Sequence, residues 1–356
     1  MMRNWSVVAS IVLAACDPGA GDAPRRTRCT ECEIHLERVG TLTDSIDPGA
    51  LPDAMVYATR DRGGRVFTIN SKKDGVLVYA ANGTLIAKLG TPGNGPGEFR
   101  VIRRVLLGPN DSIYVADWGI GRITTFGPDL KMVRADATSH QPDLALGART
   151  FVVAEQFLSR TQVAMPLHFV NDDRVVHSFG ADSSALQRDA MLLMQRIVAT
   201  AQNGDIWTVA PGRFVIERWN PVTAARTQTI HVKTDWFSET AMWPDDERAK
   251  PPAIIECLWA DDGLLWVSVR DADVDWKPPQ SANAERPLDA DAYAQTYDWI
   301  LIAIDSATGA VLATKRSSEI LWARPPSNVV VTSREHDADG SVFDVWAPRL
   351  RQRAAQ

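Results

Sequence analysis

The sequence predicts an all-β fold, a six-bladed β-propeller with four-stranded antiparallel blades and a ring closed by the N-terminal strand. Short β-branched or aromatic segments end repeatedly at Gly, Pro, Asn or Asp, which indicates strands joined by tight turns. This pattern recurs about every 40 to 60 residues, the length of one blade. A lone strand at residues 34–39 has no partner nearby in the sequence, so it is available to close a ring.

The composition is that of a globular protein. The chain has 356 residues, 45% hydrophobic and 23% charged, so it can bury a sizeable core. Its 38 Lys and Arg against 44 Asp and Glu give a net charge of -6. A chain of this charge offers no broad phosphate-binding surface, and we therefore expect no nucleic acid among its partners.

The N-terminus has the pattern of a targeting signal. Arg3 precedes a short apolar run that ends in small residues before Cys16, as in a secretory signal peptide too short to span a bilayer. The Leu-Ala-Ala-Cys run at residues 13–16 resembles the lipobox of bacterial lipoproteins. That resemblance implies that residues 1–15 are removed and that membrane lipid is attached through Cys16. The alternative is an ordinary cysteine in a signal cleaved nearby.

If the resemblance holds, the protein is lipid-anchored in the cell envelope on the extracytoplasmic side, at the inner or the outer membrane. No second run of about 18 apolar residues follows the signal, so we expect no membrane-spanning helix. Residues 16–33, rich in Asp, Pro, Gly, Ala, Thr and Arg, are predicted to form a flexible tether behind the lipidated cysteine.

Two further cysteines, Cys29 and Cys32, lie in this tether as a C-x-x-C pair. In an oxidising compartment the pattern favours a local disulfide. A redox role would need the pair at a helix N-terminus in a βαβ unit, and a zinc site would need two more ligands; neither context is present in the sequence. Cys257 lies in an apolar run and is predicted to be a buried free thiol.

Five repeat units follow in order along the chain. The strands expected in them lie at residues 65–70, 75–79 and 84–88; 112–117, 122–126 and 130–134; 150–154 and 167–170; 203–209 and 214–219; and 262–269, 299–305 and 309–313. The sixth unit must combine the two ends of the chain, with residues 329–333 and 341–346 completed by residues 34–39. We therefore expect a propeller over residues 34–350 and a C-terminal tail at residues 351–356.

The second unit carries a family resemblance. The Gly-Pro-Gly-Glu-Phe turn at residues 95–99, the strand at residues 113–117 and the segment at residues 121–126 resemble an NHL repeat. Residues 34–350 as a whole resemble bacterial six-bladed β-propeller lipoproteins, which implies the same fold here. Phe99 is sized to fill the gap between two blades, and Tyr114, Trp207 and Trp266 hold matching positions that favour packing between blades over an aromatic ligand cage.

Little in the sequence points to a particular chemistry. Six His are scattered without metal-ligand spacing, so we expect no metal and no cofactor, although a calcium site assembled from several blades stays open. The sequence contains no Gly-x-Ser-x-Gly elbow, phosphate loop or dinucleotide fingerprint. Two insertions, residues 235–252 and 271–297, are long for propeller loops and are expected to shape a site or cover one end of the channel.

Alignment of the units places several polar side chains at one end of the propeller axis. These candidate ligand-binding residues are Arg103, Arg104, Asp117, Trp118, Arg213 and Arg270. Several Arg side chains in one funnel could bind a carboxylate or sugar acid through paired hydrogen bonds. The alternative is that each lies on a solvated loop tip.

Three functions remain open on the sequence alone. The first is a non-catalytic module of the envelope that binds an unknown small molecule or envelope protein. The second is a metal- or acid/base-dependent hydrolase or lyase with its site in the central channel. The third is a structural scaffold between envelope proteins.

Overall fold

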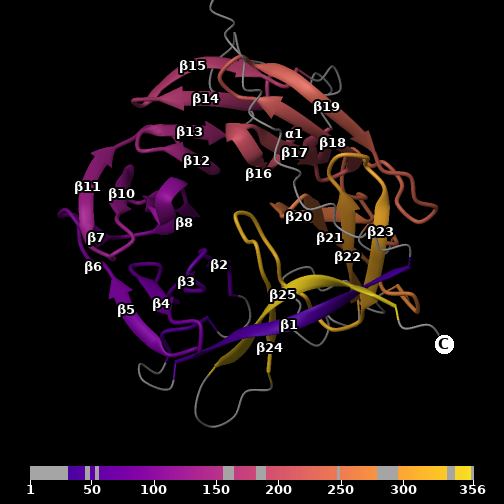
Figure 1. Ribbon diagram of the computed structural model, residues 1–356, viewed down its shortest axis with the longest axis horizontal. Helices are drawn as coiled ribbons and strands as arrows, with labels where there is room; N and C mark the ends of the chain where they lie inside the picture. Colours follow the sequence, from indigo (N-terminus) through magenta and orange to yellow (C-terminus); the bar gives the residue numbers. More distant parts are fainter. Residues whose placement is uncertain are drawn as a thin grey trace, which may run out of the picture.

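Five four-stranded antiparallel sheets and one three-stranded sheet form a ring in the computed structural model of the chain (Figure 1). The structure describes residues 31–44, 49–52, 56–154, 164–181, 190–246, 249–278, 296–334 and 341–353. The expected six-bladed propeller is therefore confirmed. Cys16, Cys29 and the predicted signal peptide lie outside the described residues.

Blades one to five each follow the chain from the inner to the outer strand, as Figure 1 shows. Blade one contains β2 (Ala58–Arg60), β3 (Val66–Ile69), β4 (Val76–Tyr79) and β5 (Leu85–Leu89). Blade two contains β8 (Ile102–Leu107), β9 (Ile113–Asp117), β10 (Arg122–Phe126) and β11 (Met132–Ala137). Blade three contains β12 (Leu144–Gly147), β13 (Thr150–Val153), β14 (Leu167–Asn171) and β15 (Arg174–Phe179).

The next two blades contain the longest strands of the first five. Blade four contains β16 (Ile197–Thr200), β17 (Ile206–Ala210), β18 (Arg213–Asn220) and β19 (Ala225–His231). Blade five contains β20 (Ile254–Asp261), β21 (Leu264–Ala272), β22 (Tyr297–Asp305) and β23 (Val311–Ser317). Short helical turns interrupt the loops at η1 (Pro109–Asp111), α1 (Met191–Met194) and η4 (Gln202–Gly204).

Blade six joins the two ends of the chain. Its strands are β24 (Val330–Ser333), β25 (Val342–Gln352) and β1 (Cys32–Thr43), with β25 in the middle and β1 outermost. The pairing of β1 with β25 runs from Cys32 opposite Gln352 to Thr43 opposite Val342, which confirms closure by the N-terminal strand. β1 ends four residues after the strand expected at residues 34–39, and β25 ends six residues after the one expected at residues 341–346. The ladder also takes in residues 32–33 and 351–352, which were expected in the tether and the C-terminal tail.

A buried carboxylate links the closing strand to the rest of blade six. Asp344 on β25 accepts a hydrogen bond from the Thr41 hydroxyl of β1 at 2.8 Å. The Nε and Nη2 atoms of Arg334 both donate to the same carboxylate at 2.7 Å. Paired donors of this kind make strong, directional contacts, so Asp344 stabilises the junction of the two chain ends.

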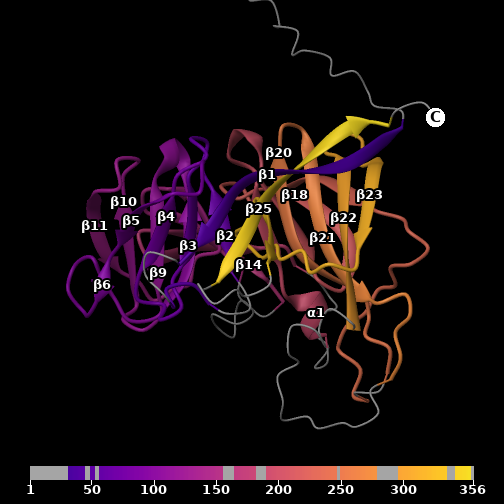
Figure 2. The same ribbon diagram turned by 90° about the horizontal axis from the view of Figure 1, so that it is seen from below.

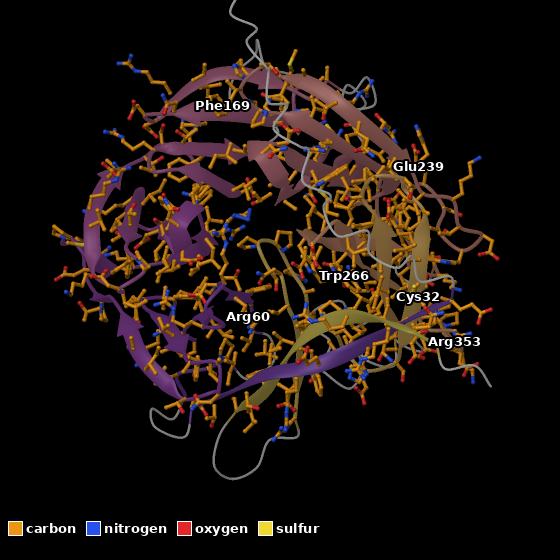
Figure 3. All side chains as sticks on the ribbon, in the orientation of Figure 1. Cys32, Arg60, Phe169, Glu239, Trp266 and Arg353 are labelled. Carbon is orange, nitrogen blue, oxygen red and sulfur yellow. The ribbon has the colours of Figure 1, made fainter. Side chains whose placement is uncertain are left out.

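Large side chains fill the spaces between blades, as the sticks in Figure 3 show. Phe99, Tyr114, Trp207 and Trp266 are all buried, as predicted. Tyr114 of blade two meets Phe151 of blade three edge to face, with 5.6 Å between ring centroids. The ring of Phe99 would overlap a side chain at residue 90, which explains a glycine there with φ of 85°.

Two cysteines can be compared with their predictions. Cys257 is buried and free, as expected, and burial raises the pKa of its thiol. Cys32 is disulfide-bonded, while Cys29 lies outside the described residues, so their pairing stays a prediction. No helix in the described part of the chain is long and apolar enough to cross a membrane.

The disc has two distinct faces. Figure 2 shows α1 on one face and the start of β1, beside the end of β25, on the other. In blade five, β20 runs from one face toward the other. Its first residue borders the central cavity, and its last residue borders a second cavity; both cavities are described below.

Candidate functional site

A cavity of about 920 Å³ lies at the centre of the ring, lined by residues from all six blades. Among the described residues, its lining includes six basic and two acidic side chains, an excess of four positive charges: Lys73, Arg103, Arg104, Arg196, Arg270 and Arg324, with Asp143 and Glu256. The chain as a whole has a net charge of -6, so positive charge is concentrated at the axis. Low-dielectric walls around such a site focus its field toward an anion.

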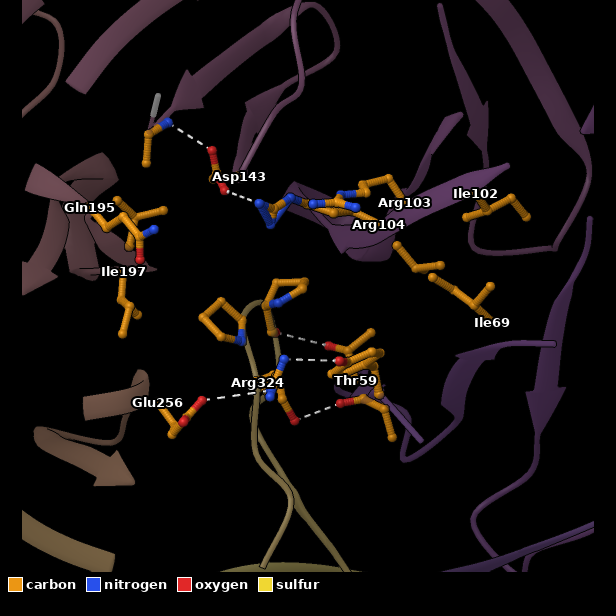
Figure 4. A pocket seen from close by; sticks show the side chains of 18 of the residues that line it. Thr59, Ile69, Ile102, Arg103, Arg104, Asp143, Gln195, Ile197, Glu256 and Arg324 are labelled. Carbon is orange, nitrogen blue, oxygen red and sulfur yellow. Dashed lines mark hydrogen bonds and ion pairs between the residues drawn. The ribbon is translucent and has the colours of Figure 1, made fainter. Parts of the chain in front are cut away.

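Arg103, Arg104 and Asp143 form one part of the lining, which we call the blade-two group (Figure 4). The Nη2 atom of Arg104 lies 2.6 Å from a carboxylate oxygen of Asp143. The other oxygen of Asp143 accepts the backbone N–H of Ala154 at 2.7 Å, which anchors the carboxylate to blade three. Arg103 is exposed and has no acidic partner among the described residues. The group therefore carries one surplus positive charge.

Arg270, Arg324 and Glu256 form a second part of the lining, the blade-five group. Arg270 pairs with Glu256 at 2.8 Å, and its guanidinium lies over the rings of Tyr297 and Trp243, 4.6 and 5.2 Å from the centroids. Burial raises the pKa of Tyr297, and the charge of Arg270 opposes that shift. Trp243 belongs to the first predicted insertion, so this insertion does shape the cavity.

Arg324 reaches the cavity on the segment between β23 and β24, which projects into the ring (Figures 1 and 4). Its Nη1 atom donates to the Tyr57 hydroxyl at 3.2 Å, and its Nε atom lies 3.6 Å from Glu256. The Ser327 hydroxyl donates to the carbonyl oxygen of Ala58 at 2.6 Å, which attaches the segment to β2. Arg324 was not among the residues predicted from the sequence; the absence of a strand pattern at residues 321–328 was the available signal.

Three of the six predicted site residues line the cavity, and three do not. Arg103, Arg104 and Arg270 line the cavity, whereas Asp117, Trp118 and Arg213 are not among its lining residues. Asp117 is fully buried and accepts backbone N–H groups of Arg100, Val101 and Gly119 at 2.7, 3.1 and 2.7 Å. This carboxylate holds the entry into blade two, because three otherwise unpaired backbone donors converge on it.

The remaining two predicted residues, Trp118 and Arg213, have partners outside the lining of the cavity or at its border. Trp118 is 59% exposed, and the guanidinium of Arg103 lies 5.8 Å from its ring centroid. Arg213 forms a two-pronged pair with Glu239, at 2.9 and 3.0 Å, on a loop beyond β19 (Glu239 is labelled in Figure 3). The repeat alignment does not predict the direction that a loop takes after its strand. That direction determines whether a side chain in the loop reaches the axis.

A second cavity, of about 2070 Å³, lies at the opposite face between blades five, six and one. Its charged lining is mixed: Arg60, Asp61, Arg62, Asp261, Asp262, Asp305 and Arg349. Arg349 contacts Asp261 at 3.4 Å and Glu37 at 3.2 Å, so acidic and basic groups pair there. Across the described residues, no three His, Cys, Asp or Glu side chains gather as a metal site.

Comparisons with known proteins agree with the fold. The sequence profile of a family described as 6-bladed beta-propeller matches residues 55–136. No curated protein matches the sequence. A Bacteroides fragilis protein provisionally described as exported shares the fold, with a TM-score of 0.57 and 8% identity, over 92% of this chain and 96% of that one.

Two further solved structures are similar at low identity. A DUF4221 family member from Bacteroides vulgatus has a TM-score of 0.57 and 9% identity, covering 90% of this chain and 99% of its own. Virginiamycin B lyase from Staphylococcus aureus has a TM-score of 0.43 and 7% identity, covering 89% of this chain and 99% of its own. The two Bacteroides likenesses show the propeller fold alone, so function has to be argued from the cavity.

Proposed function

We propose that this protein is a non-catalytic binding module of the cell envelope, and that its central cavity holds a small organic anion. The observation that carries the proposal is the excess of four positive charges in a cavity at the axis of a negatively charged chain. Guanidinium groups offer paired N–H donors that match a carboxylate, and four of the six basic residues belong to the blade-two and blade-five groups.

The energetics favour an anion over an empty cavity. Asp143 and Glu256 each pair with arginine, and they neutralise two of the six basic groups. Like charges crowded in a partly desolvated site repel one another, and a bound anion relieves that repulsion. An anion is therefore the ligand class that the charge of the cavity supports best.

The proposal also includes a place and an orientation. Lipid at Cys16 would tether the mature chain to a membrane of the envelope, as in the bacterial six-bladed lipoproteins with NHL-type repeats that the sequence resembles. Cys32 begins β1 opposite Gln352, which borders the second cavity rather than the central one. A tether leaving from this face would turn the central cavity away from the membrane.

The test is a thermal-shift screen of the purified mature chain against organic anions at low ionic strength. A ligand present at about 100 times its Kd should stabilise the folded chain by about 2.7 kcal/mol. Arg270→Gln, which removes a charge from the cavity, should reduce the shift produced by the best ligand. Arg213→Gln removes the same charge from a residue outside the cavity and should keep it.

Arg324→Gln serves as a second cavity variant if Arg270→Gln melts early without ligand. The proposal is overturned if no anion raises the melting temperature, or if Arg213→Gln loses the shift as fully as the cavity variants do. A protein that co-purifies with the chain in the absence of any small ligand would favour the protein-binding alternative and count against the anion.

A further inference from the structure

The basic residues of the cavity lie in two separated groups rather than in one cluster. The blade-two group includes side chains next to and on β8, and the blade-five group includes Arg270 on β21 and Glu256 on β20. In a ring of six blades, blades two and five are diametrically opposite. Figure 1 shows β8 and β20 on opposite sides of the axis, and Figure 4 shows Arg104 and Asp143 across the cavity from Arg324 and Glu256.

Each group has the same charge balance. Two guanidinium groups and one carboxylate leave one surplus positive charge on each side. A compact anion such as phosphate would leave one of the two groups without a counter-charge. A molecule with one anionic group at each end would neutralise both.

Apolar side chains line part of the cavity. They come from blades two, four, five and six: Ile102, Ile197, Val198, Ile254, Ile255, Pro325 and Pro326. Polar side chains such as Thr59, Asn70 and Gln195 also border the cavity. This mixed lining suits a carbon frame that carries acid groups at its ends.

We propose that the cavity binds an organic dianion with two separated carboxylates, one held by the blade-two group and the other by the blade-five group. This inference rests on the proposed anion-binding function and narrows its ligand class. Two sources supply this chemistry: an aliphatic dicarboxylic acid, and a short uronic acid oligomer with one carboxylate on each of two sugars.

The experiment is isothermal titration of the mature full chain with three sets of probes. The first set is linear dicarboxylates of increasing length, the second is their monocarboxylates of equal length, and the third is a diuronic acid with its monouronic acid. We expect the best two-acid probe to bind at least about tenfold tighter than its one-acid match, equivalent to about 1.4 kcal/mol. Affinity should peak at one length, because the two groups are a set distance apart.

Variants on each side decide whether both groups take part. One variant from each group is tested: Arg103→Gln and Arg324→Gln. Each should reduce the affinity of the two-acid probe to that of its one-acid match. Both should leave the one-acid probe within about threefold, because it can still use the other group. Arg226→Gln, which removes an exposed charge on β19, is the matched control and should change neither affinity.

The outcomes distinguish failure of the dianion inference from failure of the proposed anion-binding function on which it rests. Preference for the aliphatic or for the uronic probes supports the inference and identifies the source of the dianion. If one-acid and two-acid probes bind equally, the dianion inference is wrong while anion binding stands. If no anionic probe binds at all, both are wrong.

Discussion

Replacing Asp117 should destabilise the propeller, because this carboxylate is the sole side chain that accepts the backbone N–H groups of Arg100, Val101 and Gly119 in the described structure. Hydrogen bonds to a charged group contribute about 1.5–3 kcal/mol each, and three on one carboxylate are not fully additive. We therefore expect Asp117→Ala to lower the free energy of unfolding by about 3–5 kcal/mol. For a chain of this size, that corresponds to a fall of about 4–7 °C in the melting temperature.

The assay is thermal unfolding followed by circular dichroism at matched protein concentration. Asp117→Asn keeps the shape of the side chain but turns an NH₂ group toward at least one backbone donor, so it should melt between the parent and Asp117→Ala. The neighbouring Trp118→Ala is the control, because this exposed ring should cost less than about 1 kcal/mol. A melting temperature for Asp117→Ala within about 2 °C of the parent would refute the architectural role.

Three other predictions follow from the sequence and the fold. Mass spectrometry of the mature protein should find residues 1–15 removed and Cys16 diacylated at the new N-terminus; an unmodified Cys16 would contradict the lipid anchor. Deleting residues 17–31 should leave the melting temperature nearly unchanged, whereas deleting residues 17–43 should lower it strongly, because β25 loses its outer partner and Leu42 leaves the core; equal melting temperatures would count against closure by β1. Cys257 should resist iodoacetamide at pH 8 in the native state and react when unfolded, and the free energy of unfolding should fall as the pH rises above about 9, since burial disfavours the thiolate that forms freely in the unfolded chain; rapid native labelling would contradict this burial.

Much of the propeller could be predicted because its strands are encoded locally. In blade two, alternation and turn residues placed strands at 112–117 and 122–126, within a residue of β9 and β10. Closure could be predicted as well, because a strand at residues 34–39 without a neighbour has few places to pair in a ring. Burial of Cys257 was predicted from its apolar run, and burial of Phe99 from its size and its place after the turn at residues 95–98.

The candidate site was predictable only in part. Arg270 directly follows the predicted strand at residues 262–269, and Arg103 and Arg104 follow the turn at residues 95–99; all three line the cavity. Asp117 follows the same alignment, but backbone donors from a loop 16 and 17 residues earlier in the chain occupy its carboxylate. Repeat alignment cannot distinguish a cavity-lining residue such as Arg270 from a structural residue such as Asp117, because it contains no information about hydrogen-bond partners.

The sequence by itself determined the strand order, the blade count and the two chain ends that meet, because these depend on periodicity and on turn residues. Only the tertiary structure decided which charges reach the axis. Arg324 enters the cavity because the segment before β24 projects inward and is attached to β2 through Ser327 and Asn328, contacts that span more than 260 residues. Glu256 and Arg324 likewise meet only after blades five and six are packed together, and local sequence carries no trace of such a pairing.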